Sequence, residues 1–197
     1  MIFSLLKRAE SSVWGVNYLP FFRLYICFHL FKRIVFEWSS LDLLLGTDGF
    51  VTIEYSEKPN LLGAILLGLR EHYEFLIYVY LVVIICYAFG IGKHFMALIL
   101  FILFAIIQRL TYQTLNGGDN LMFFVILYMI FADSYSNFTV TPLYLSEPVK
   151  KISSFFTFFS VMSITMHLCL VYFISAISKL NTEDWYNGVA LYYVLQQ

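Results

Sequence analysis

Lys179 and two hydroxyl-bearing side chains that precede it form the first group in this sequence that could do chemistry. Tyr172, Ser175 and Lys179 follow a long apolar run, and they lie within about 60° of one another on a helix that turns about 100° per residue. An amine held among aromatic side chains loses hydration, and this favours its neutral form, which can act as a base or a nucleophile. The alternative is a lysine that anchors a membrane helix by extending its ammonium group to the lipid interface.

Basic side chains also lie inside the first apolar run, where charged groups usually face the protein interior and mark functional sites. Tyr25, His29 and Lys32 share one helical face, which predicts a polar stripe that points into the protein. Arg23 either extends to the lipid interface or pairs with a carboxylate. Lys32 and Arg33, near the end of the run, can extend to the interface in the same way.

Sequence motifs for metals and nucleotides are absent. There is no HExxH, CxxC or paired-histidine spacing, and no GxGxxG or Walker loop, so we expect no metal site and no nucleotide cofactor. Cys27, Cys86 and Cys169 lie far apart in apolar runs, which predicts core thiols rather than a redox pair or a metal site. His167 is expected to pack or to hydrogen-bond between helices rather than to bind a metal.

The elements that position these residues are expected to be membrane helices. The chain has 197 residues, of which 60% are hydrophobic, 20% aromatic and only 13% charged, whereas soluble domains have about 45–50% apolar and about 25% charged residues. Mean hydropathy is +0.78. Unbroken apolar runs favour helices over the alternating strands of a membrane barrel. With 12 basic and 13 acidic residues, the net charge gives no reason to expect a nucleic-acid partner.

We predict an all-α, polytopic transmembrane helical bundle with about five complete spans, the start of a sixth and one short interfacial helix. A span takes about 20 apolar residues. The five complete spans are expected over residues 18–38, 73–89, 95–110, 121–132 and 152–177. The interfacial helix is expected over 61–69 and the start of the sixth span over 189–195. We interpret residues 1–197 as one transmembrane domain that is incomplete at its C-terminus.

Basic residues near the span ends favour an N-terminus on the cytoplasmic side, by five residues to four. In this orientation the polar segments around Asp48, over 116–120 and over 179–185 share the outer face. Such a layout is expected for a site that faces the periplasm, a lumen or the outside. We therefore expect a multi-pass protein of the cell membrane, and in a bacterium of the inner membrane.

Three blocks of the sequence follow one another in a pattern shared with a known membrane family. The first is FFRLYI at 21–26, followed by 43–51 with Asp48-Gly49. The second is LNGGDN at 115–120, which opens an apolar run. The third and most specific is YFISAISKL at 172–180, followed by DWYNGVALYY at 184–193. In this order they resemble the HTTM domain (horizontally transferred transmembrane domain), the membrane domain shared with vitamin K-dependent gamma-carboxylase.

The resemblance implies a catalytic base and a cofactor. In the carboxylase, oxidation of reduced vitamin K generates a strong base that removes a proton from a glutamate side chain, and carbon dioxide then adds to the carbanion. Lys179 matches the family's candidate base for deprotonating the hydroquinone, which implies a reduced, vitamin K-like quinone as the cofactor. The residues expected to bind substrate or shape its pocket are Arg23, Asp119, Tyr172 and Trp185.

The sequence also departs from the carboxylase pattern. Where the carboxylase has a functional histidine in an Ala-Asn-His-Tyr-like run, this chain has Ala132-Asp133-Ser134-Tyr135, and it lacks the soluble part that binds the propeptide. The alternative function is a non-enzymatic accessory membrane protein, similar to HTTM members that assist maturation of a secreted bacterial peptide toxin. Its partners would be the lipid bilayer and a secreted peptide. A transporter is disfavoured, because no internal repeat with paired broken helices is evident.

Overall fold

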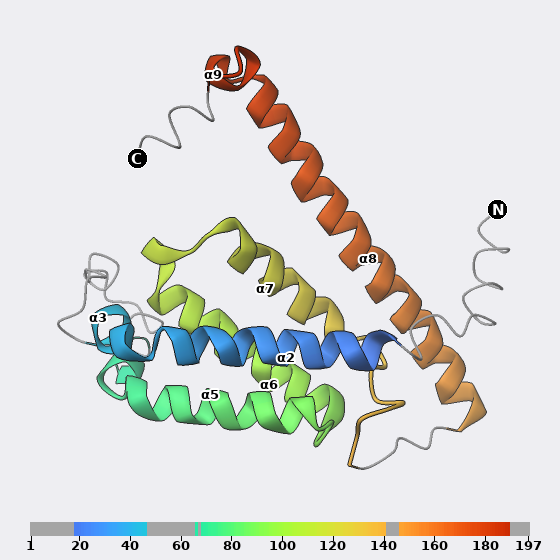
Figure 1. Cartoon of the computed structure of the whole chain (residues 1–197). Coiled ribbons are helices and arrows are strands. Elements are labelled where there is room, and N and C mark those ends of the chain that lie inside the picture. The colour runs from blue at the N-terminus through green and yellow to red at the C-terminus, as the bar shows by residue number, and fades with distance from the viewer. Residues whose placement is uncertain (1–17, 47–65, 67, 141–145, 190–197) are drawn as a thin grey trace, which may run out of the picture.

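The computed structural model is all-α over the residues that it describes, which are 18–46, 66, 68–140 and 146–189 (Figure 1). Four helices form the body of the molecule, and α5 packs against both α2 and α6, while α6 packs against α7. These helices are α2 (Tyr18–Phe36), α5 (Tyr73–Ala88), α6 (Lys93–Leu110) and α7 (Gly117–Met129). The predicted all-α fold class is confirmed for this part of the chain.

A fifth long helix, α8 (Glu147–Leu180), leans across the body at one end and extends well beyond it at the other (Figure 1). It packs against α7, and Val161 and Ile164 contact the hydrophobic core from its first half. The short elements are η1 (Trp38–Ser40), α3 (Leu41–Leu45), η3 (Tyr112–Thr114) and α9 (Glu183–Tyr186).

Each of the five expected spans corresponds to a helix, with shifted ends. The helix α7 begins at Gly117 because Asn116 caps it, and α8 begins at Glu147 with Pro148 in its first turn, where proline is tolerated. Residues 89–92, with glycines at 90 and 92, separate α5 from α6. The interfacial helix expected over 61–69 and the sixth span expected over 189–195 lie mostly outside the described residues.

Two of the helices are long and apolar enough to cross a membrane, α6 and the Pro148–Leu180 part of α8. Only 28% and 6% of their apolar windows are buried inside the protein, whereas the core helix of a soluble protein is mostly buried. Large exposed apolar surfaces mark contact with another partner or with lipid. These two helices indicate a membrane protein. The helices α5 and α7 are apolar but shorter, and α2 carries three basic side chains.

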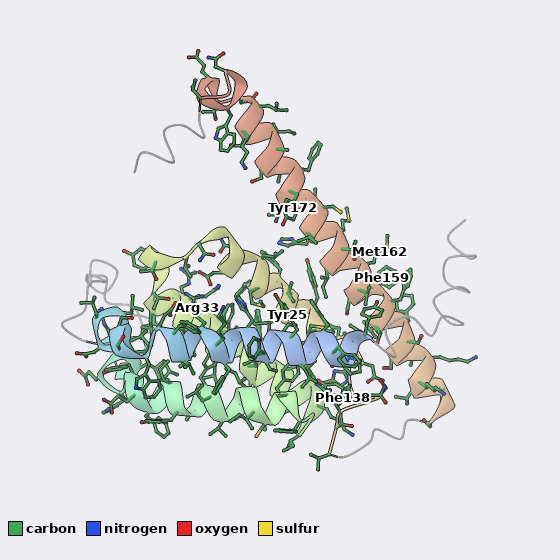
Figure 2. All side chains as sticks on the ribbon, in the orientation of Figure 1. Tyr25, Arg33, Phe138, Phe159, Met162 and Tyr172 are labelled. Carbon is green, nitrogen blue, oxygen red and sulfur yellow. The ribbon has the colours of Figure 1, made fainter. Side chains whose placement is uncertain are left out.

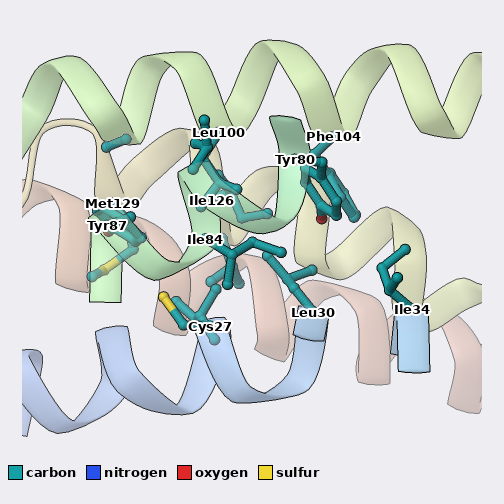
Figure 3. Close-up of a cluster of buried hydrophobic side chains, with 14 of the residues drawn as sticks. Cys27, Leu30, Ile34, Tyr80, Ile84, Tyr87, Leu100, Phe104, Ile126 and Met129 are labelled. Carbon is teal, nitrogen blue, oxygen red and sulfur yellow. The ribbon is translucent and has the colours of Figure 1, made fainter. Parts of the chain in front are cut away.

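The hydrophobic core lies between α2, α5, α6 and α7 (Figure 3). Leu30 from α2, Ile84 from α5, Leu100 from α6 and Met129 from α7 meet there, and each is at most 2% exposed. Apolar side chains at spacings of three and four residues place this face of each helix inward. The core fixes the relative positions of the polar side chains at either end of α2.

The buried face of α2 is not the predicted one. Tyr25 is 60% exposed, and His29 and Lys32 are exposed as well, so the expected inward polar stripe is wrong. The buried side chains of α2 are Leu19, Pro20, Arg23, Ile26, Cys27, Leu30 and Ile34. Their spacing of three and four residues forms an apolar stripe on another side of the helix, and burial of that stripe determines how the helix is rotated.

The cysteines and His167 have mixed outcomes. All three cysteines are free thiols; Cys27 is buried as predicted, Cys86 is half-buried, and Cys169 is exposed, so the expected core position is wrong for Cys169. The reason is that this part of α8 extends beyond the other helices, since every side chain from 168 to 180 is exposed (Figure 1). The ring of His167 lies 4.5 Å from the ring of Phe124 on α7, measured between centroids, which confirms a packing role.

The turn between α5 and α6 supports the segment that follows α7. Gly90 has φ +68°, and a Cβ atom there would lie 2.4 Å from Cγ2 of Thr139, so only glycine fits both the backbone and the contact. The backbone N–H of Val140 donates to the carbonyl of Phe89 at 3.1 Å. Residues 133–140 are thereby held across this turn, beside the first half of α2.

Candidate functional site

The polar centre of the helix body is an ion pair between α2 and α7. Nη1 of Arg33 contacts Oδ1 of Asp119, and Nε of Arg33 lies 3.2 Å from Oε1 of Glu37. The Asp119 side chain is 7% exposed and the Arg33 side chain 26%. Arg33 therefore does not simply extend to the lipid interface, which was one expectation for it. Arg33 instead pairs with Asp119, which the sequence analysis identifies as a candidate site residue.

Asp119 is fixed by the start of α7. Its Oδ2 accepts from the backbone N–H of Asn116 at 3.0 Å, while Oδ1 of Asn116 accepts from the N–H groups of Gly118 and Asp119 at 2.8 and 3.1 Å. This reciprocal pair is a capping box, which satisfies backbone donors that a helix start leaves free. Nε2 of Gln108 on α6 also donates to the carbonyl of Asp119 at 2.8 Å. The carboxylate is thus held by both α2 and its own helix.

A small cavity lies beside Arg33, between α2, α3, α5 and α6. Its volume is about 30 Å³, and its polar lining comes from Arg33, Glu37, Tyr80, Gln108 and Thr111. This volume holds about two water molecules, whereas pockets for organic ligands measure about 300–1,000 Å³. The cavity can hydrate the ion pair, and it is too small for a quinone ring.

Arg23 lies in a second polar cluster, near the other end of α2. Its side chain is fully buried and donates to three backbone carbonyls of the segment after α7: Nη1 to Ser134 at 2.6 Å, and Nη2 to Phe138 at 2.7 Å and Asn137 at 3.3 Å. Its guanidinium carbon lies 5.2 Å from the ring centroid of Tyr135. Arg23 therefore does not extend to the interface, and its described hydrogen-bond partners are carbonyl oxygens rather than a carboxylate.

The segment bound by Arg23 has its own polar contacts. The backbone N–H of Asp133 donates to Oγ1 of Thr157 on α8 at 2.9 Å, and Nδ1 of His94 on α6 lies 2.7 Å from the carbonyl oxygen of Ile130. Burial raises the pKa of the Tyr135 phenol above its ordinary value, so this phenol is neutral and can donate as well as accept. The segment joins α2, α6 and α8 through hydrogen bonds.

Lys179 and Trp185 lie together at the far end of α8, with Tyr172 about two turns earlier on the same helix, away from both clusters. Nζ of Lys179 lies 4.5 Å from the ring centroid of Trp185 on α9. Tyr172 is 70% exposed and Trp185 42% exposed. Figure 2 shows Tyr172 on the part of α8 that stands clear of the helix body, whereas Arg33 lies within the body. The structure thus groups Lys179 with Trp185 and separates both from Arg23 and Asp119.

Some residues of the two clusters were missed by the sequence reasoning. Gln108 and Thr111 lie at the end of α6, and Tyr87 joins Tyr135 near Arg23 with ring centroids 6.5 Å apart. The available signal was the spacing of Tyr80 and Tyr87, which places two phenols on one face of an apolar helix. Among the described residues, no group of three or more His, Cys, Asp or Glu side chains could hold a metal ion.

We compared the chain with known protein families, curated proteins and solved structures. No protein-family model, no curated protein and no solved structure matches this chain.

Proposed function

We propose that this chain is a multi-pass protein of the cell membrane, in a bacterium the inner membrane, built on an HTTM-like scaffold. The lengths of the helices support this. At about 1.5 Å per residue, the 19 residues of α2 and the 18 of α6 extend about 28 and 27 Å, close to the roughly 30 Å of a bilayer core. The 34 residues of α8 extend about 51 Å, so α8 would cross with a tilt or project beyond the core.

The orientation proposed here is the one that the sequence favours, by five basic residues to four. Lys93 starts α6, and Lys150 and Lys151 lie in the first turns of α8. The Arg33–Asp119 pair lies at the opposite end of the body, because α2 and α6 run toward it and α7 starts there (Figure 1). In this orientation Lys93, Lys150 and Lys151 face the cytoplasm, whereas Arg70 and Arg109 lie at the outer end with the Arg33–Asp119 pair, so the orientation rests on the count over the full sequence.

The role that the geometry supports best is that of a non-enzymatic accessory protein that assists maturation or export of a secreted peptide. The observation that carries this proposal is the separation of the candidate residues. Arg23, Arg33 and Asp119 are bonded to the protein itself, whereas Tyr172 and Trp185 are exposed at the outer end of α8 in the proposed orientation. Exposed tyrosine and tryptophan side chains are favoured contacts for a peptide partner.

The position of Lys179 favours this role over quinone chemistry. A base must be available as the neutral amine, which burial among apolar groups promotes. Lys179 is instead exposed, and the face of the Trp185 ring attracts its charged ammonium form. The residue therefore fits an anchor or a peptide contact better than a base that removes a proton from a hydroquinone.

A paired experiment tests the accessory role. Cells that express the chain, lack it, or carry Tyr172→Ala or Trp185→Ala would be compared by mass spectrometry of secreted peptides, with Tyr25→Ala as the exposed-tyrosine control on α2. We expect loss of a mature peptide from the medium in the deletion and both α8-end variants, but not in the control. An unchanged set of secreted peptides contradicts the accessory role.

A second assay tests the enzymatic alternative in membranes that contain the chain. We expect no turnover of a reduced, vitamin K-like quinone above that of membranes without the chain. Turnover that disappears in both Lys179→Ala and Lys179→Arg would overturn the accessory proposal in favour of Lys179 as a base, since arginine keeps the charge and the anchor but does not deprotonate.

A further inference from the structure

The cluster around Arg23 contains polar atoms that its described hydrogen bonds do not satisfy. Arg23, Tyr87, Ser134 and Tyr135 are each at most 1% exposed. Nε of Arg23, the hydroxyls of Tyr87 and Tyr135, and Oγ of Ser134 are buried without a hydrogen-bond partner among the described residues. They come from α2, from α5 and from the segment after α7, so three parts of the chain meet at these atoms.

These four groups lie close together. The rings of Tyr87 and Tyr135 meet edge to face with centroids 6.5 Å apart, and Arg23 lies over the Tyr135 ring. The hydroxyl of Ser134 lies within the range of a side-chain hydrogen bond of both phenols. None of the three hydroxyls reaches another with the geometry of a direct hydrogen bond. Polar groups that converge without well-formed direct hydrogen bonds are the arrangement that a bridging molecule produces.

The chemistry of the cluster defines the bridging molecule. Nε of Arg23 can only donate, whereas each of the three hydroxyls can donate and accept, so the ligand must accept from Arg23 and can donate to or accept from the hydroxyls. The guanidinium already binds three carbonyl oxygens, and the Asp133 carboxylate lies near enough to act on Arg23 electrostatically. The positive charge is thereby balanced in part, which favours an uncharged ligand over an anion.

We propose that Arg23, Tyr87, Ser134 and Tyr135 form a buried site for ordered water, which links α2 and α5 to residues 133–138. Buried water typically makes about three hydrogen bonds to groups that would otherwise be unsatisfied. An unpaired polar group in a low-dielectric interior is costly, and a bound water removes this cost for several groups at once. The site is independent of the proposed accessory role.

Whether the Tm falls or rises when a hydroxyl is removed distinguishes a hydrated site from a set of unpaired groups. Tyr87→Phe and Tyr135→Phe would be measured singly and together as the apparent Tm of the purified chain in detergent. A hydroxyl that binds water is lost at a cost, so we expect each single variant to lower Tm by roughly 2–4 °C. The double variant should lower Tm by less than the sum, because both hydroxyls bind the same water. Tyr78→Phe, an exposed tyrosine on α5, is the control and should not change Tm.

Two results would overturn the proposal. If the hydroxyls are unpaired, each Phe variant leaves Tm unchanged or raises it, since removing an unsatisfied buried group is neutral or stabilising. If the site holds an anion, the Tm of the parent chain rises when gluconate is replaced by chloride, and Tyr135→Phe abolishes this rise. Bound water is supported if the Tm of the parent chain is the same in both salts and if Tyr87→Phe and Tyr135→Phe each lower the Tm.

Discussion

Arg33 on α2 and Asp119 on α7 form an ion pair between residues 86 positions apart in the chain. The helix α2 packs mainly against α5, whereas α7 packs against α6 and α8. The pair therefore ties together two helices that share little direct packing. Since Asp119 also closes the capping box of α7, one carboxylate determines both where α7 begins and where its first turn lies relative to α2.

Removing one partner of this pair should destabilise the fold. Breaking a fully buried ion pair costs about 3–5 kcal/mol, and since the Arg33 side chain is 26% exposed, we expect Arg33→Gln to cost about 3 kcal/mol or less. Chemical denaturation in detergent measures this loss. The combination of Arg33→Gln with Asp119→Asn should cost less than the two single variants added together.

The neighbouring cation provides the control for this pair. Lys32 is exposed on the same helix, and Lys32→Gln is expected to change the unfolding free energy by less than about 0.5 kcal/mol. Equal losses for Lys32→Gln and Arg33→Gln would show that the charge of α2, rather than the pair with Asp119, carries the effect.

The cap of α7 should contribute separately. Asn116→Ala removes the side chain that accepts from Gly118 and Asp119, and loss of such a cap costs about 0.5–2 kcal/mol. Asn116→Asp retains an accepting oxygen and should recover most of the loss. Asn120→Ala, an exposed position one turn further along, serves as the control in the same denaturation assay. An equal loss at both positions would contradict a specific role for the cap.

The approximate positions of the long helices were accessible from the sequence because they depend on local signals, and the start of α7, expected at residue 121, lies at Gly117, where a local signal was overlooked. Apolar runs and the glycine-rich breaker mark α5 and α6, and Asn116 with Asp119 three residues later is the pattern of a capping box. Such features involve residues within a few positions of each other. They require no knowledge of which helices meet.

The partners of the buried charges were not accessible in the same way. The side chain of Arg23 binds carbonyls more than a hundred positions away, in a segment whose sequence shows no helical periodicity. Arg33 meets a carboxylate on a helix that is not its main packing partner. The rotation of α2 decides both contacts, and it follows from the burial of Leu19, Ile26 and Leu30 rather than from the polar stripe.

Arg23 should tolerate neither a neutral nor a compact cationic replacement. Arg23→Gln loses charged hydrogen bonds to the carbonyls of Ser134 and Phe138, and leaves these carbonyls unsatisfied, so we expect a loss of about 3 kcal/mol or more. Arg23→Lys keeps the charge but not the planar guanidinium that binds several carbonyls at once, so it should recover only part of the stability lost in Arg23→Gln. Limited proteolysis within 133–140 should quicken in parallel. Arg109→Gln, an exposed arginine on α6, should have no effect, and a similar loss there would contradict a specific role for Arg23.

Cysteine labelling tests whether α7 crosses the membrane, which its 13 residues do not establish by length. In a chain with Cys27, Cys86 and Cys169 replaced by alanine, single cysteines would be placed at Asn120, in the first turn of α7, and at Val149, in the first turn of α8, which are both exposed. We expect a membrane-impermeant maleimide to label Asn120→Cys in intact cells and Val149→Cys only after permeabilisation. The opposite pattern would invert the proposed orientation, since α7 still separates the two positions. Equal labelling of both positions in intact cells, or of neither, would place both ends of α7 on one side and contradict a bundle in which α7 spans the bilayer.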